Sequence, residues 1–225
     1  MRMEEAVRKP YAGSGERVFP PFPEPAIPGV RGGFYVRYGK RALDVGLAAI
    51  GLAIGLPIIL LFAVLIVLET EGPAFYVQER VGLRGRPFRV IKLRSMVADA
   101  EKDGARWADK NDSRVTKVGA FIRKTRIDEL PQLVNVLKGE MTLIGPRPER
   151  AWFTHQFNRE IPGFIDRLQV KPGLTGWAQV NGGYDISPRE KLRLDLEYIA
   201  SLSLRKELQI LFRTFKVILT GDGAR

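Results

Sequence analysis

The chain of 225 residues contains no cysteine and a single histidine, His155. The lack of cysteine excludes disulfide bonds, zinc sites built on thiolates and catalysis by a thiol nucleophile. One histidine is too few for a histidine-rich metal centre. Chemistry based on carboxylates, on hard metal ions such as Mg²⁺ and on phosphate binding by Arg and Lys stays open.

Acidic residues are also in short supply. Lys and Arg together number 36 against 25 Asp and Glu, so the formal net charge is +11. A charge of this sign favours polyanionic partners, namely nucleic acid, anionic lipid or phosphorylated substrates. The length is enough for one sizeable domain together with an anchor. Hydrophobic residues make up 45% of the chain, so a core can form.

Residues 1–33 show no apolar periodicity and are rich in proline and glycine. This composition is typical of a flexible leader. A secretory signal peptide is not expected, because the apolar segment that follows starts too late and is too long. We therefore expect a leader over 1–33 and a single functional domain over 34–225, made of a membrane helix at 42–68 and a globular part at 72–225.

The segment Val45–Leu68 has no charged residue over 24 positions. As a helix it would be about 36 Å long, against about 30 Å for the hydrocarbon core of a bilayer. Pro57 lies near its centre, where proline kinks a helix. Basic residues flank both ends, although a crossing helix usually carries them on the cytoplasmic side. These residues leave two interpretations open: a spanning helix, and a re-entrant helix that bends at Pro57 and returns.

Beyond Gly72-Pro73 the pattern indicates a small mixed domain. Phe75–Val81 and Phe88–Leu93 are rich in aromatic and β-branched residues and have glycines between them, which predicts a β-hairpin. The polar segment 97–110 predicts a helix. The Gly and Pro content of 139–149 and 171–188 is typical of irregular loops. Further helices are expected at Val118–Lys124, Leu130–Leu137, Pro188–Ser201 and Arg205–Leu219.

The last of these helices is amphipathic, with apolar residues at i, i+3, i+4 spacing and basic residues over much of the remaining surface. This composition suits a helix lying on an anionic membrane surface, although a helix packed on a core has the same pattern. The segments together predict an α+β fold. Its parts would be a Pro-kinked, re-entrant membrane helix and a small, mostly helical cytoplasmic domain with a β-hairpin and amphipathic interfacial helices.

Asp128-Glu129 is the strongest candidate for catalysis. The pair precedes an apolar helical run, and Pro131 suits the first turn of a helix. The simpler interpretation is that Asp128 caps this helix and Glu129 complements its dipole. The same geometry favours a bound phosphate. Two adjacent carboxylates also suit Mg²⁺ binding or nucleophilic attack on phosphorus by one of them.

Further residues suit phosphate or nucleotide binding. Arg147 lies between two prolines, and a stiff Arg favours two-pronged contacts with phosphate; a solvated turn residue is the alternative. Lys92 and Arg94 end the second hairpin strand, either as phosphate ligands or as ordinary edge charges. The glycine-rich segment Lys171–Val180 contains Trp177, which either covers a nucleotide base or packs in the core.

Taken together, these stretches resemble the bacterial sugar transferase family, the monotopic polyprenyl-phosphate phosphoglycosyl transferases. The resemblance runs through residues 35–223 in order, so chance similarity does not explain it. A minimal, single-domain form of the family is expected. The resemblance is carried by Lys40-Arg41 with Asp44, the apolar block with Pro57, Gly72–Gly82, Lys92–Met96, Asp112–Thr116, Asp128–Leu133, Gly145–Pro148 and Lys171–Gly176.

The resemblance implies roles for individual residues. Asp128 would be the nucleophile and Glu129 its catalytic partner, and both would hold a Mg²⁺ ion. Arg147 would bind the phosphates of a nucleotide-sugar. Pro57 would break a re-entrant membrane helix. Other substrate-binding residues are expected at Lys92, Arg94, Arg114 and Gln179.

The implied reaction transfers a sugar-1-phosphate from a UDP-sugar to polyprenyl (undecaprenyl) phosphate and releases UMP, through a covalent aspartyl phospho-sugar. It would initiate the assembly of exopolysaccharide, capsule, O-antigen or glycoprotein glycans. The partners would be these two substrates and the lipid bilayer, with no nucleic acid, and a homodimer is a further expectation. The protein would be monotopic, at the cytoplasmic face of the bacterial inner membrane.

Two departures from the family pattern affect these expectations. Gly183-Tyr184 stands where many members have Arg-Asn, and Arg126 stands where serine is frequent before the catalytic pair. Two other functions remain open: a membrane-tethered basic module that binds nucleic acid or anionic lipid, and a glycosyltransferase that releases UDP. The basic module explains the charge and the apolar block, but not Asp128-Glu129 or the Gly145–Pro148 loop.

Overall fold

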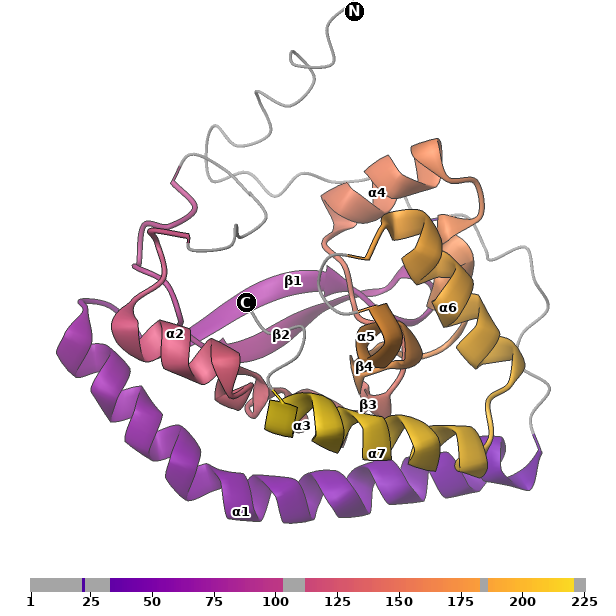
Figure 1. The fold of residues 1–225 in the computed structure, drawn as a ribbon, viewed down its shortest axis with the longest axis horizontal. Coiled ribbons are helices and arrows are strands. Elements are labelled where there is room, and N and C mark those ends of the chain that lie inside the picture. Colours follow the sequence, from indigo (N-terminus) through magenta and orange to yellow (C-terminus); the bar gives the residue numbers. More distant parts are fainter. Residues whose placement is uncertain (1–21, 23–32, 103–111, 183–185, 221–225) are drawn as a thin grey trace, which may run out of the picture.

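The structure is a computed structural model that describes residues 22, 33–102, 112–182 and 186–220. The predicted leader therefore lies outside the described residues, apart from Phe22 and Gly33. A π-helical turn, η1 (Tyr35–Gly39), runs directly into the long helix α1 (Lys40–Glu69). Figure 1 shows α1 as one bent rod along one side of the other elements.

Helix α1 matches the apolar helix expected at 42–68 and continues without interruption through Pro57. Proline is the usual cause of a bend inside a helix. The segment Tyr35–Glu69 is long and apolar enough to cross a membrane by length and composition. Its buried residues form one stripe at intervals of four and seven, which is one face of a helix: Asp44, Ala48, Gly55, Ile59 and Ile66. Most of its other apolar side chains are exposed.

The predicted hairpin is confirmed as β1 (Phe75–Val81) and β2 (Pro87–Leu93), joined by the 3₁₀ turn η2 (Leu83–Gly85). The strands pair antiparallel, with Phe75 opposite Leu93 and Val81 opposite Pro87. Helix α3 (Gln132–Lys138) packs against both α1 and β2. The core of this layer is made of Ala48, Phe88, Val90, Leu133, Val136 and Met141.

Most of the predicted helices lie within two residues of their expected ends. They are α2 (Lys117–Lys124), α3, α6 (Pro188–Ala200) and α7 (Leu204–Thr220). The helix expected at 97–110 is wrong in its described part, because 98–102 form turns; 103–111 lie outside the described residues. Among the elements not expected from the sequence are three helices: α4 (Ala151–Glu160), the 3₁₀ helix η4 (Phe164–Gln169) and α5 (Trp177–Gly182).

The two segments expected to be irregular loops are also corrected. They contain β3 (Thr142–Ile144) and β4 (Gly173–Thr175), which pair parallel with Thr142 opposite Gly173. The glycines permit this pairing because the two backbones approach closely. A Cβ atom added at Gly173 would lie 2.1 Å from the backbone nitrogen of Gly145.

Both ends of α1 are attached to the same globular part. Near its start, Arg41 donates hydrogen bonds to two carbonyls at the end of α3, those of Val136 at 2.6 Å and Leu137 at 2.9 Å. At its end, Glu69 accepts hydrogen bonds from the first backbone N–H groups of α2. The guanidinium of Arg94 donates to the carbonyls that follow α1, those of Thr70, Glu71 and Gly72. Helix α1 is therefore held to one body along its whole length.

The close approach of β3 and β4 yields a test of the fold. We expect Gly173→Ala to lower the free energy of unfolding by about 2 kcal/mol or more, since the added methyl overpacks the strand pair. Gly46→Ala is the matched control, because nothing lies within 4 Å of its added Cβ and alanine is the better helix former by about 1 kcal/mol. Thermal unfolding in lipid nanodiscs measures both variants. Equal melting temperatures for the two would contradict the β3–β4 packing.

Candidate active site

A cavity of about 330 Å³ lies beside the hairpin, and residues from β1, β2, α2, α4, α5 and α6 contribute to its lining. Of the described residues that line it, nine are basic and three are acidic. The acidic residues are Glu101, Asp128 and Glu149; the basic ones are Arg80, Lys92, Arg94, Arg123, Arg126, Arg147, Arg150, Arg167 and Lys191. A concave surface with this excess of positive charge attracts a phosphorylated ligand.

The candidate catalytic pair lies in η3 (Ile127–Glu129), a 3₁₀ turn just ahead of α3. Both carboxylates are buried. The residue before the turn, Arg126, has a left-handed backbone with φ 61°, which is unfavourable for a residue with a side chain. The capping interpretation is not what the structure shows. The residues at the N-cap positions of η3 and α3 are Arg126 and Pro131, and neither makes a side-chain cap bond.

Glu129 is held by two cations that the sequence analysis selected. Arg147 approaches it with both terminal nitrogens, Nη1 at 3.2 Å from Oε2 and Nη2 in contact with Oε1. Nζ of Lys92 lies 3.1 Å from Oε1. Burial alone would raise the pKa of Glu129, but Arg147 and Lys92 outweigh it and hold the pKa well below its usual range. Glu129 is therefore a fixed negative charge.

Asp128 has the opposite environment. Its Oδ1 atom is buried and has no hydrogen-bond partner. Burial raises the pKa of Asp128 to about 6, with a smaller contribution of the same sign from Glu129 and opposing ones from Lys92 and Arg147. Two neighbouring carboxylates with pKa values pushed apart are a common arrangement in catalytic sites. Above pH 6, Asp128 is an ionised and incompletely satisfied carboxylate in the lining of the cavity.

The backbone that carries Arg147 is fixed on both sides. Nη2 of Arg167 donates to the carbonyl of Arg147 at 2.8 Å, and Arg167 is itself paired with the buried Asp195 at 2.6 Å. Arg80 donates to the carbonyl of Pro148 at 3.2 Å. Arg147 is thus not a solvated turn residue, because its side chain pairs with Glu129 and its backbone is held in place.

The other residues proposed from sequence divide into two groups. Gln179 lines the cavity and has a buried Oε1 atom without a hydrogen-bond partner. Arg94 also lines it, but its guanidinium binds the carbonyls after α1. Arg114 is not among the described lining residues, and its guanidinium binds Asp112 and the carbonyl of Ala100. Trp177 is buried in the core cluster of α5, α6 and α7, which favours its packing interpretation.

Several basic lining residues were missed by the sequence analysis, although a signal for one was present. Tyr76, Gln78 and Arg80 occupy alternate positions of β1 and line the cavity, as the two-residue period of a strand requires. Tyr76 is the cross-strand partner of Lys92. The hairpin register could therefore have identified Arg80 as a lining residue on the same face of the hairpin as Lys92. The remaining ones, such as Arg150, Arg167 and Lys191, come from distant segments. The Gly183-Tyr184 departure lies outside the described residues.

The described residues contain no group of three or more His, Cys, Asp or Glu that could hold a metal ion. Mg²⁺ does not require such a group, because it is usually bound by one or two carboxylates together with substrate phosphates and water. The unpartnered oxygen of Asp128 beside Glu129 fits this requirement.

Comparison with known proteins bears on this site. The sequence profile described as Bacterial sugar transferase matches residues 35–221. Over 189 residues the chain is 50% identical to a UDP-N-acetylgalactosamine-undecaprenyl-phosphate N-acetylgalactosaminephosphotransferase of Aeromonas hydrophila, covering 83% of this chain and 45% of that protein. It is 43% identical over 190 residues to a UDP-glucose:undecaprenyl-phosphate glucose-1-phosphate transferase of Caulobacter vibrioides, covering 82% and 71%.

A third relative, from Bacillus subtilis, carries the provisional name undecaprenyl-phosphate N-acetylgalactosaminyl 1-phosphate transferase. It is 66% identical over 129 residues, covering 57% of this chain and 72% of that protein. The chain thus spans less than half the length of the Aeromonas relative and about seven tenths of the other two. The profile match covers all of α1 to α7 and the whole cavity lining, so the chain belongs to the bacterial sugar transferase family.

Proposed function

We propose that this protein is a phosphoglycosyl transferase that moves a sugar-1-phosphate from a UDP-sugar to undecaprenyl phosphate and releases UMP. One observation supports this most directly: the unpartnered carboxylate of Asp128 lies in a cationic cavity, next to a Glu129–Arg147 pair. The names of the relatives, which specify a UDP-sugar and undecaprenyl phosphate, agree with this transfer. We further propose that the reaction initiates polysaccharide assembly.

In the first half-reaction, a carboxylate oxygen of Asp128 attacks the phosphorus that bears the sugar. A bond forms between this oxygen and phosphorus, the bond to the bridging oxygen breaks, and UMP leaves with the electron pair. In the second half-reaction, a phosphate oxygen of undecaprenyl phosphate attacks the same phosphorus. This step releases the Asp128 carboxylate and yields undecaprenyl diphosphate-sugar. A covalent route of this kind divides a difficult transfer into two easier steps.

Arg147 and Lys92 supply positive charge for the transferred phosphoryl group. Their present partner is Glu129, so arriving phosphate oxygens would compete with this carboxylate for both cations. A planar guanidinium suits this exchange, because it binds carboxylate and phosphate with the same two-pronged geometry. Asp128 and Glu129 would hold Mg²⁺, which when bound neutralises charge on the phosphates.

We further propose that the protein is monotopic and lies at the cytoplasmic face of the inner membrane. Both ends of α1 are hydrogen-bonded to one polar domain, which disfavours placing them on opposite sides of a bilayer. The exposed apolar side chains of α1, and those of Leu208, Phe212 and Phe215 on α7, would enter the lipid. A re-entrant α1 bent at Pro57 and an interfacial α7 satisfy these observations.

This topology predicts that both flanks of α1 are reached from the same side. The chain has no native cysteine, so single cysteines at Gly33 and Glu71 report their location directly. In right-side-out spheroplasts a membrane-impermeant maleimide should label neither site, and in inverted vesicles it should label both. Labelling of one site from each side would instead establish a spanning helix.

The nucleophile hypothesis makes a prediction for UDP-sugar without lipid acceptor. The unsubstituted protein should release about one UMP per active site and retain the phospho-sugar, because the two half-steps are separable. Asp128→Asn should abolish both events, since a neutral amide is a poor nucleophile. Release of UDP would favour the alternative glycosyltransferase. Turnover by Asp128→Asn would favour direct attack by the lipid phosphate.

The raised pKa of Asp128 predicts a pH-dependent effect on stability. A carboxyl whose pKa is about 6 when folded and about 4 when unfolded destabilises the fold once it ionises, so the cost is complete above pH 6 and absent below pH 4. Asp128→Asn should therefore raise the melting temperature by several degrees at pH 7.5 in the presence of EDTA. This gain should disappear near pH 4. A loss of stability at pH 7.5 would contradict the buried, unpartnered environment of this carboxylate.

A further inference from the structure

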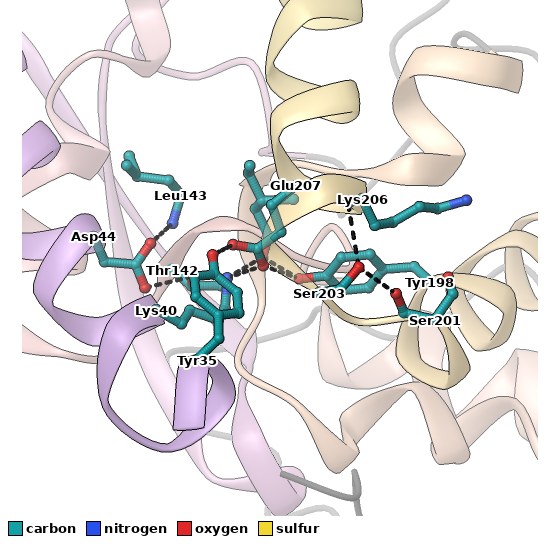
Figure 2. A network of polar contacts seen from close by, with 11 residues as sticks. Tyr35, Lys40, Asp44, Thr142, Leu143, Tyr198, Ser201, Ser203, Lys206 and Glu207 are labelled. Atoms are coloured by element: carbon teal, nitrogen blue, oxygen red, sulfur yellow. Dashed lines mark hydrogen bonds and ion pairs between the residues drawn. The ribbon is translucent and has the colours of Figure 1, made fainter. Parts of the chain in front are cut away.

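A buried carboxylate outside the cavity joins α7 to η1, α1 and α6. Glu207 on α7 is 5% exposed, and it accepts hydrogen bonds from Tyr35 before α1, from Lys40 at the start of α1 and from Tyr198 on α6 (Figure 2). A buried ion pair of this kind adds little net stability compared with well-packed apolar residues. Its presence at the junction of α1 and α7 therefore requires another explanation.

Two of the three donors also hold the end of strand β3. Nζ of Lys40 lies 3.0 Å from the carbonyl oxygen of Ile144, and the hydroxyl of Tyr198 lies 2.8 Å from the same atom. One turn further along α1, Asp44 accepts hydrogen bonds from Oγ1 of Thr142 at 2.6 Å and from the backbone N–H of Leu143 at 2.9 Å (Figure 2). Every residue of β3 is thus held by the first turns of α1. Glu207 orients Lys40 and Tyr198, the two donors that bind the carbonyl at the end of β3.

Strand β3 leads directly to the active site. Ile144 is its last residue, and Arg147 follows three positions later with its guanidinium on Glu129. The intervening backbone is fixed by the hydrogen bond from Gly145 to the carbonyl of Thr175, at 2.8 Å. A displacement of the Ile144 carbonyl would therefore be transmitted to Arg147 through a short and rigid segment.

The two helices that meet at Glu207 also carry exposed apolar side chains near this junction. Leu43 and Leu47 on α1 and Leu204 and Leu208 on α7 are all exposed. The surface proposed to enter lipid is thus continuous with the network that holds β3. We propose that Glu207 is a positioning residue. It couples the packing of α7 against α1 to the position of Arg147 through the hydrogen bonds that hold β3. This inference rests on the proposed function, since it acts through the phosphate-binding role of Arg147.

A double-mutant cycle tests the coupling in the full chain reconstituted in nanodiscs. UMP release is measured with UDP-N-acetylgalactosamine or UDP-glucose, whichever the unsubstituted protein uses. Glu207→Gln and Arg147→Lys should each reduce kcat/KM about 10- to 100-fold, as misplaced catalytic groups do. In the Arg147→Lys background, Glu207→Gln should cost less than about twofold, because coupled residues are non-additive.

Glu197→Gln is the matched control. Glu197 also pairs with a lysine of α7, Lys206 at 3.1 Å, but it lies exposed on α6, where its other ion-pair partner is Arg193 of the same helix, so this variant should keep near-normal activity. If Glu207 has a purely structural role, Glu207→Gln will reduce kcat/KM by the same factor in the unsubstituted protein and in Arg147→Lys. That result would overturn the inference. Full activity of Glu207→Gln would overturn it as well.

If Glu207→Gln does not fold, Tyr198→Phe replaces it in the same cycle. This substitution removes only the hydroxyl that reaches Ile144 and Glu207 and keeps the packing of the ring. It should show the same non-additivity with Arg147→Lys, and additive losses would again refute the coupling. UMP release by the unsubstituted protein separates the two proposals. If no UMP is released, the proposed function is refuted, whereas UMP release with additive Glu207 effects refutes the positioning role alone.

Discussion

The attachment of both ends of an apolar helix to one polar domain is the constraint on which the rest of this structure depends. A free apolar helix of this length would cross a bilayer. Here Arg41 and Glu69 tie its two ends to α3 and α2, and a stripe from Asp44 to Ile66 packs on the domain between them. The remaining surface of α1 is left apolar and exposed. The cavity therefore lies in a domain whose position relative to lipid is set by this helix.

The two carboxylates of the candidate catalytic pair differ in their electrostatic environment. Glu129 and Asp128 are neighbours in sequence, yet Arg147 and Lys92 lower the pKa of the first while burial raises that of the second. The 3₁₀ turn makes this possible, because it directs adjacent side chains into different surroundings. In the proposed reaction, Glu129 anchors the two cations that would bind phosphate, and Asp128 supplies the attacking oxygen.

Much of this arrangement could be predicted from local pattern. Aromatic and β-branched residues with glycines between them predicted the hairpin, and local helix signals predicted α2, α3, α6 and α7. Four of the residues selected from sequence form one cluster in the structure: Asp128, Glu129, Lys92 and Arg147. The missed features depend on distant partners. Strands β3 and β4 have three residues each and pair across about thirty positions, too short for a periodic signal. Arg94 looked like a phosphate ligand because nothing local indicates the carbonyls after α1 that its guanidinium binds.

The sequence separation of the contacts at the start of α1 has a consequence for synthesis of the protein. Lys40 reaches Glu207 across 167 positions and Asp44 reaches Thr142 across 98. A ribosome will have made the chain as far as Glu207 before the first turn of α1 finds its final partners, so this hydrophobic segment emerges long before its docking surface exists. During that interval it needs a chaperone or the bilayer itself, and the order of translation makes final docking of α1 among the last events of folding.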